Sequence, residues 1–153
     1  MTPRTSSYLV VNGAIMILIG LAAGFPFAFE VLQRFELWPL PFVIPFDPPG
    51  DVRAWRMAHL EGILNGIFLF VVAGLASHVR LSPRGAAWVF WGLLVMGWGN
   101  VIASTLSPIF DARGLTFGGF WNSISYFLFV AGIFGAVAAL IALIGGALAR
   151  AKE

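Results

Sequence analysis

Four long apolar runs divide the 153-residue chain, with polar or proline-rich connections between them. They cover approximately residues 8–29, 54–79, 86–107 and 120–148. A helix needs about 20 residues to cross a hydrocarbon core about 30 Å thick, and each run is long enough. The sequence therefore predicts an all-α fold: an integral membrane four-helix bundle that forms a single domain over residues 1–153.

The connection between the first two runs reads RFELWPLPFVIPFDPPGD and contains five prolines. Prolines at this density exclude a helix and favour an extended, kinked backbone. Trp38, Phe42 and Phe46 indicate that this segment lies along the membrane surface, where aromatic rings are enriched.

Basic residues divide between the two ends of the predicted bundle. One end would carry Arg4, Arg80, Arg84, Arg150 and Lys152, and the other Arg34, Arg53, Arg56 and Arg113. By the positive-inside rule both termini are expected in the cytoplasm, by a margin of one basic residue.

Composition supports a lipid environment and excludes several chemistries. Hydrophobic residues make up 59% of the chain and charged residues 10%, against about 25% charged in soluble domains. The absence of cysteine excludes disulfides, thiolate catalysis, iron–sulfur clusters and cysteine-ligated metals. Basic residues are scattered rather than clustered with aromatics, so we expect no nucleic-acid partner.

Polar residues enter the second run together, with His59, Glu61 and Asn65 inside seven positions. Such groups are costly in hydrocarbon and persist mainly where they bind, pair or react. A rise of 1.5 Å per residue puts polar residues of the third and fourth runs in the same half of the membrane. The sequence predicts one polar pocket in an apolar bundle, with these residues around it: His59, Glu61, Asn65, Asn100, Ser104, Asn122 and Tyr126.

Helical phase separates the members of this cluster. Glu61 and Asn65 are four residues apart and share a face. His59 lies six residues from Asn65, or about 120° around the helix. Gly62 and Gly66 would let another helix or a flat ring approach closely, and oligomer packing is the simplest interpretation of that pair.

His59 has several possible roles. It could be structural, bonded to Glu61 or to a loop carbonyl, or it could be a metal ligand, a haem ligand or a proton carrier. A protein-only metal site needs three or four ligands, which subunits would have to pool. His78 lies about 28 Å away along the same helix, so neither a proton path nor a bis-histidine haem fits one subunit. Met96 is interpreted as core packing.

Three motifs in order point to a family. They are WRMAHLEGILNG (55–66), MGWGNV (96–101) and RGLTFG (113–118). With four apolar runs in a chain of this length, they resemble the styrene oxide isomerases, which are small integral membrane enzymes.

The resemblance implies a homotrimer that holds haem b near its subunit interfaces, with His59 as the axial ligand. The ferric iron would act as a Lewis acid on the oxygen of an aryl epoxide. Ring opening and a 1,2-hydride shift, a Meinwald rearrangement, would then give an aryl acetaldehyde. Asn65 would help to hold the epoxide, and Trp98 and Asn100 match positions around the pocket. The expected location is a bacterial inner membrane, where the bilayer supplies hydrophobic epoxides.

The chain departs from this family pattern at two positions. Met96 stands where members carry an aspartate, and Ser104 where they carry a tyrosine. Tyr126 or Glu61 could supply the missing group. Two alternatives therefore stay open: a non-catalytic haem-binding membrane protein and a small transporter subunit.

Overall fold

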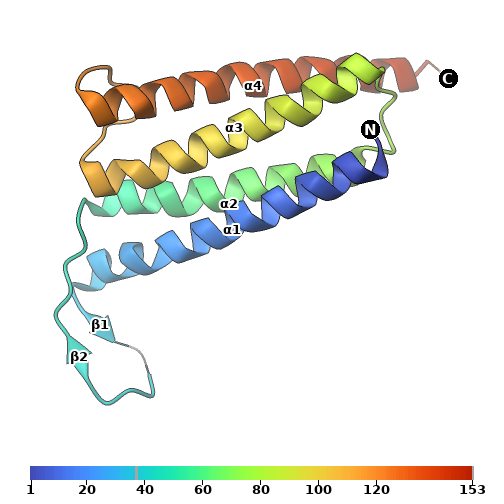
Figure 1. The fold of residues 1–153 in the computed structure, drawn as a ribbon. Helices are drawn as coiled ribbons and strands as arrows, with labels where there is room; N and C mark the ends of the chain where they lie inside the picture. The colour runs from blue at the N-terminus through green and yellow to red at the C-terminus, as the bar shows by residue number, and fades with distance from the viewer. Residues whose placement is uncertain (37, 153) are drawn as a thin grey trace.

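The computed structural model describes residues 1–36 and 38–152, which form an antiparallel bundle of helices (Figure 1). The helices are α1 (Pro3–Leu32), α2 (Val52–Leu75), α3 (Pro83–Phe110) and α4 (Phe120–Arg150). Each is long and apolar enough to cross a membrane. Within these described residues, the predicted all-helical fold with four membrane-length helices is confirmed.

The helix ends differ from the predicted apolar runs. α1 and α3 begin earlier than predicted, because the side chains of Thr2 and Ser82 accept hydrogen bonds from backbone amides of the first turn. These polar caps lie outside the apolar runs, so hydropathy does not reveal them. α2 ends at Leu75, four residues before the predicted Val79, where the chain turns with His78 N donating to Leu75 O at 2.9 Å.

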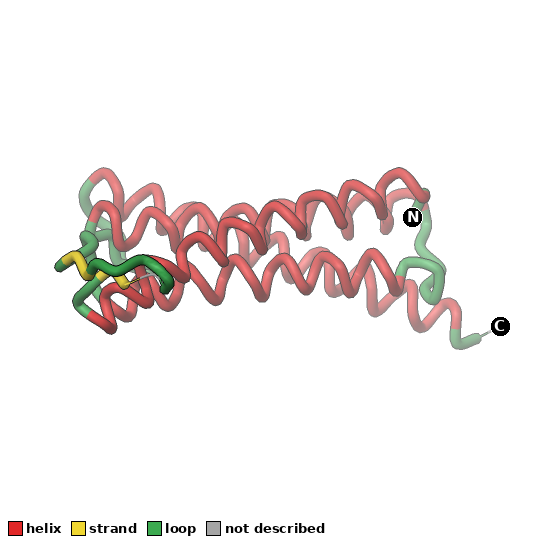
Figure 2. The backbone as a smooth tube through the Cα atoms, turned by 90° about the horizontal axis from the view of Figure 1, so that it is seen from below, coloured by secondary structure: helices red, strands yellow, loops and turns green. Residues whose placement is uncertain are grey.

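The helices lie side by side in chain order across the bundle (Figures 1 and 2). α1 packs most extensively against α2, and α3 against α4, while α2 and α3 join the two pairs. The loops before α2 and before α4 share one end of the bundle, and both termini lie at the other. The α2–α3 interface is therefore the middle of the molecule.

Glycines bring the paired helices into close contact. A Cβ on Gly66 would lie 2.5 Å from Gly13 O, and one on Gly62 would overlap Gly20 Cα. The α3–α4 pair is equally close, since a Cβ on Gly92 would lie 2.5 Å from the backbone oxygen facing it on α4. The interpretation of Gly62 and Gly66 as an oligomer contact or a seat for a flat ring is therefore wrong, because α1 covers both glycines.

The proline-rich connection contains no helix in its described part, as predicted. Two short strands, β1 (Phe35–Glu36) and β2 (Val43–Ile44), pair antiparallel in a hairpin that the sequence did not predict. The hairpin projects sideways beyond the end of α1 (Figure 1), and Trp38 in its turn is 90% exposed. Its position along a membrane surface stays a prediction.

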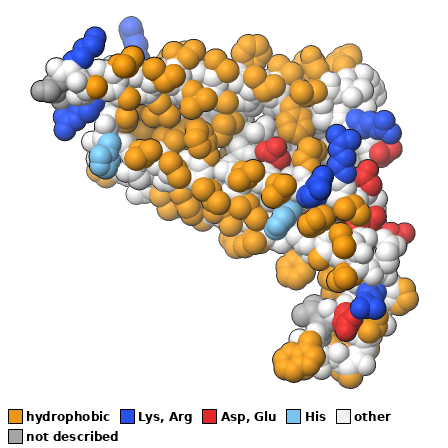
Figure 3. Space-filling view, turned by 180° about the vertical axis from the view of Figure 1, so that it is seen from behind, with side chains coloured by type: hydrophobic (Ala, Val, Ile, Leu, Met, Phe, Trp, Pro, Cys, Tyr) orange, Lys and Arg blue, Asp and Glu red, His pale blue; other side chains and the backbone are white. Residues whose placement is uncertain are grey.

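The face of the bundle in Figure 3 is mostly apolar between its charged ends, with acidic and histidine side chains interrupting the apolar surface. Large side chains point outward on the outer helices, with Leu18 64% and Phe134 71% exposed. An apolar surface of this extent is rare on soluble monomers, which expose only small contiguous patches. It fits four helices surrounded by lipid.

Candidate functional site

His59 lies at the α1–α2 interface rather than toward a loop. Its Nδ1 is 2.8 Å from the backbone oxygen of Gly20 on α1. The ring of Phe27 stacks on the imidazole with centroids 6.1 Å apart. Gly24 leaves room for the ring, because a Cβ there would lie 2.8 Å from Nδ1. The imidazole is thus held by three residues of α1, and neither Glu61 nor a loop carbonyl is its partner in this contact.

The Gly20 contact decides which imidazole nitrogen carries the proton. A carbonyl oxygen can only accept, so Nδ1 must donate. A neutral His59 then has its free lone pair on Nε2. Histidines that ligate metals commonly have this arrangement, in which a backbone carbonyl or carboxylate holds the other ring N–H.

Asn65 belongs to a separate polar group between α2 and α3. Its Nδ2 donates to Glu61 O at 2.8 Å and to Glu61 Oε2 at 2.7 Å. Asn100 of α3 donates from Nδ2 to Asn65 Oδ1 at 3.3 Å. Asn65 is 6% exposed and Glu61 is half-buried, so the amide network lies inside the bundle.

The structure therefore brings Asn65 and Asn100 together but places His59 on another face of α2. This agrees with the 120° of helical phase between His59 and Asn65.

Four of the residues predicted at the site lie outside both groups: Ser104, Tyr126, Trp98 and Asn122. Ser104 is fully buried, and its hydroxyl donates to Val101 O of its own helix at 3.2 Å. The Tyr126 ring packs edge-on against Phe117, with centroids 5.6 Å apart.

Trp98 makes a link that the sequence did not reveal. Its Nε1 donates to Asn12 Oδ1 on α1 at 2.8 Å, which ties α3 to α1 across the bundle. Asn12 was missed, although it is a lone amide inside the first apolar run. Asn122 was expected at the polar pocket; its Oδ1 instead accepts from Arg113 N at 2.8 Å in the loop before α4.

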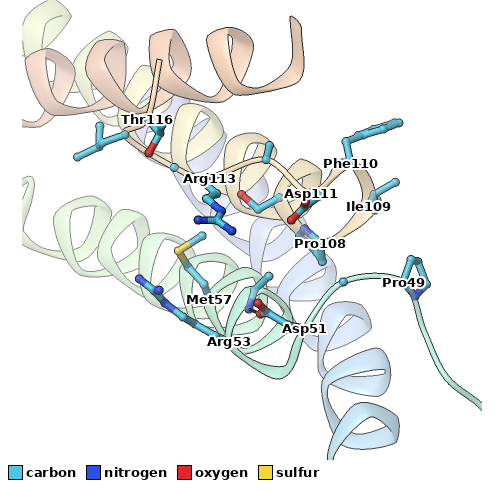
Figure 4. A pocket seen from close by; sticks show the side chains of 16 residues that line it. Pro49, Asp51, Arg53, Met57, Pro108, Ile109, Phe110, Asp111, Arg113 and Thr116 are labelled. Atoms are coloured by element: carbon cyan, nitrogen blue, oxygen red, sulfur yellow. Dashed lines mark hydrogen bonds between the residues drawn. The ribbon is translucent and has the colours of Figure 1, made fainter. Parts of the chain in front are cut away.

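A cleft of about 880 Å³ opens at the end of the bundle where α2 begins and α3 ends (Figure 4). In Figure 4, Arg113 reaches from the loop after α3 toward α2, beside Met57. The cleft is lined by residues 49–51, 53, 54, 57 and 107–116, so it contains none of the predicted site residues. Met57 precedes Glu61 by four residues, so the cleft lies one helical turn above the amide network.

The described residues contain no group of three or more histidine, aspartate or glutamate side chains able to hold a metal ion. His59 could still serve a metal that takes its remaining ligands from a cofactor.

Comparison with protein families matches the chain to the styrene oxide isomerase family model over residues 5–148. The chain belongs to the styrene oxide isomerase family. The match covers all four helices, which confirms the resemblance carried by the three motifs. No curated protein matches the chain. The name of the styrene oxide isomerase family implies an isomerase.

The two departures from the family pattern have different surroundings. Met96 is 8% exposed and belongs to the hydrophobic core, as predicted. Ser104 is also enclosed, so neither position presents a polar group to an open space. Glu61, which contacts Asn65 directly, is better placed than Tyr126 to supply the group that this family member lacks.

Proposed function

We propose that the protein is a haem-dependent isomerase that converts aryl epoxides of the styrene oxide type into aryl acetaldehydes. The family match supports the reaction class. The observation that carries the cofactor assignment is the contact between His59 Nδ1 and Gly20 O, which leaves Nε2 as the ligating nitrogen.

His59 would hold the haem, and Phe27 and Gly24 would fix the plane of its ring. Bound ferric haem b would supply a Lewis-acid iron that polarises an oxygen without moving a proton. With His59 as its single protein ligand, the haem would remain able to bind that oxygen.

The chain's own residues would bind the epoxide and keep water away. The amide network of Asn65 and Asn100 would provide a hydrogen-bond donor for one small oxygen atom in a largely apolar interior. The rearrangement moves one hydrogen between neighbouring carbons and neither adds nor removes atoms, so the site needs no proton relay to the surface. Exclusion of water prevents diol formation, and aromatic faces stabilise positive charge on carbon by about 0.5–2 kcal/mol each.

We also propose that the protein acts as a homotrimer in a bacterial inner membrane, with both termini in the cytoplasm. Glu61 supports the oligomer, because its carboxyl group is only half-buried in a membrane-spanning helix. Contact between a polar group and lipid is costly, and a neighbouring subunit packed against Glu61 would remove it.

The test is an absorption spectrum of the protein purified in detergent after growth with a haem precursor. We expect a Soret band that His59→Ala removes and that His78→Ala preserves. His78 is the matched control because it is exposed and lies outside α2. Styrene oxide should yield phenylacetaldehyde with the wild type only when haem is bound. A colourless protein that still isomerises the epoxide would refute the cofactor.

A second candidate is a non-catalytic haem-binding membrane protein. It is favoured by Met96 and Ser104, which replace polar groups of the family with a core methionine and an enclosed hydroxyl. This candidate predicts a Soret band that depends on His59, together with no consumption of styrene oxide.

A further inference from the structure

The carboxyl group of Glu61 makes a contact that the proposed function does not yet use. Glu61 lies in α2, half-buried in the apolar part of the bundle. Its Oε2 accepts from Asn65 Nδ2 at 2.7 Å, a distance within the usual range of N–H···O hydrogen bonds. Burying a carboxyl group in a membrane-spanning helix costs free energy, and such groups are found mainly at functional sites. We therefore expect Glu61 to have a role in the site.

Glu61 fixes the orientation of Asn65. An asparagine amide can be turned by 180°, exchanging its oxygen and its NH₂ group, and the choice depends on its neighbours. The backbone oxygen of Glu61 only accepts, and so does its side chain when ionised. Both lie within 2.8 Å of the same nitrogen atom of Asn65. Asn65 must therefore turn its NH₂ group toward Glu61 and its oxygen toward α3.

The orientation of Asn65 in turn fixes that of Asn100. Because the atom of Asn65 that faces α3 is an oxygen, Asn100 has to donate to it, at 3.3 Å. The Asn100 oxygen then points toward α4, where a Cβ on Gly132 would lie 3.0 Å from it. Hydrogen bonds thus run in one direction, from Asn100 through Asn65 to Glu61.

This direction determines which N–H remains for a ligand. Asn65 has two amide hydrogens, and both have acceptors on Glu61. Asn100 has two as well, and one goes to Asn65. Among the residues that the structure describes, no acceptor takes the second Nδ2 hydrogen of Asn100. The donor left for the oxygen of a substrate therefore belongs to α3.

We propose that Glu61 is a positioning residue that fixes the amide orientation of Asn65 and, through it, of Asn100, so that Asn100 donates the hydrogen bond to the epoxide oxygen. Its part in catalysis rests on the proposed function, whereas its effect on the two amides does not. The role of Asn65 is then to transmit the orientation.

The first test measures the amides by NMR without any turnover. The chain contains four asparagines, so asparagine labelled with ¹⁵N in its side chain gives four resolvable NH₂ groups. If the purified protein carries haem, it is reduced and bound to carbon monoxide so that the iron is diamagnetic. Glu61→Leu removes the side-chain acceptor, leaves Asn65 with the backbone oxygen alone, and should move the Asn65 and Asn100 resonances. Glu61→Gln keeps an oxygen that accepts and should leave them near the wild-type positions.

Two internal controls accompany this experiment. The Asn122 resonances report that a variant is folded, because that amide, in the first turn of α4, accepts a hydrogen bond from Arg113 N in the preceding loop. Asn12→Leu breaks a different buried contact and should leave Asn65 and Asn100 unchanged. If Glu61→Leu leaves both amides at their wild-type positions in a folded protein, the positioning role is refuted.

The second test is a double-mutant comparison of kcat and KM for styrene oxide. Glu61→Leu should lower kcat about tenfold or more with little change in KM, because the misplaced donor matters most as charge develops on the oxygen. Glu61→Gln should keep kcat close to the wild-type value. Asn100→Leu should lower kcat at least as far, and the double variant should be no worse than Asn100→Leu alone.

Additive losses in the double variant would show that Glu61 acts independently of Asn100 and would overturn the proposal. A wild type that converts no epoxide, but whose amides respond to Glu61→Leu, would refute the proposed function and leave the positioning role standing.

Discussion

Gly24 is the residue on which the placement of the His59 ring depends most directly. A methyl group at this position would lie 2.8 Å from His59 Nδ1 and 3.0 Å from Cε1. The first distance is shorter than contacts that real Cβ atoms make, and the second is tighter than most of them, so Gly24→Ala must displace the imidazole or separate α1 from α2. Either movement lengthens the hydrogen bond from Nδ1 to Gly20 O, which measures 2.8 Å.

The expected losses of stability and of haem affinity follow from the role of that hydrogen bond in holding the imidazole. Its loss should reduce stability by about 1 kcal/mol. Loss of such an outer-shell contact typically weakens metal binding about 10- to 100-fold. We therefore expect Gly24→Ala to raise the Kd for haem by about that factor, or about 1.4–2.7 kcal/mol. The measurement is a titration of the purified protein with hemin, followed at the Soret band.

Gly74→Ala is the matched control for this experiment. Gly74 also lies in a helix, but a Cβ added to it would have no neighbour within 4 Å. It should leave the Kd unchanged. The ring can also be followed without haem, because the chain has two histidines and ¹⁵N NMR resolves their tautomers. A Gly24→Ala protein with wild-type haem affinity and an unchanged His59 tautomer would refute the reasoning.

Three further outcomes test the packing of the bundle. Asn12→Leu and Trp98→Phe remove the two sides of one half-buried hydrogen bond. A double-mutant cycle of unfolding free energies should therefore give a coupling of about 0.6 kcal/mol, and zero coupling would contradict the contact. Gly62→Leu should separate α1 from α2 and lower the unfolding temperature far more than Gly74→Leu, as measured by circular dichroism. Asn122→Ala removes the acceptor for a loop amide and should destabilise the start of α4 by about 1 kcal/mol, seen as faster hydrogen exchange in that loop.

The sequence predicts the helices well because crossing a bilayer requires long apolar runs, and such runs are visible without any knowledge of packing. The proline-rich loop is equally local in origin, since each proline restricts its own backbone. Strands β1 and β2 were missed because pairs of two residues leave no detectable alternation in the sequence.

The arrangement of the polar residues was harder to predict from the sequence, because it depends on which helix packs against each side of α2. Helical phase separates His59 from Asn65 but does not say that α1 lies on one side and α3 on the other. Gly62 and Gly66 illustrate the same limit, because small residues permit a close helix contact without naming the partner. Asn12 was overlooked for a related reason: its partner, Trp98, lies 86 positions away.

The rigidity of α2 has a consequence for where a substrate can bind. The helix is continuous from Val52 to Leu75, so His59 and Asn65 stay about 9 Å apart along its axis and about 120° apart around it. Within one chain, a group ligated by His59 and a substrate held by the amide network therefore lie in different interhelical grooves. The proposed trimer resolves this if the imidazole of one subunit and the amides of its neighbour serve the same site. Coexpression of His59→Ala and Asn65→Leu chains, each inactive alone, should then restore part of the activity, because mixed trimers contain sites with both wild-type residues. Mixed trimers that bind haem but remain inactive would show that one chain supplies both residues.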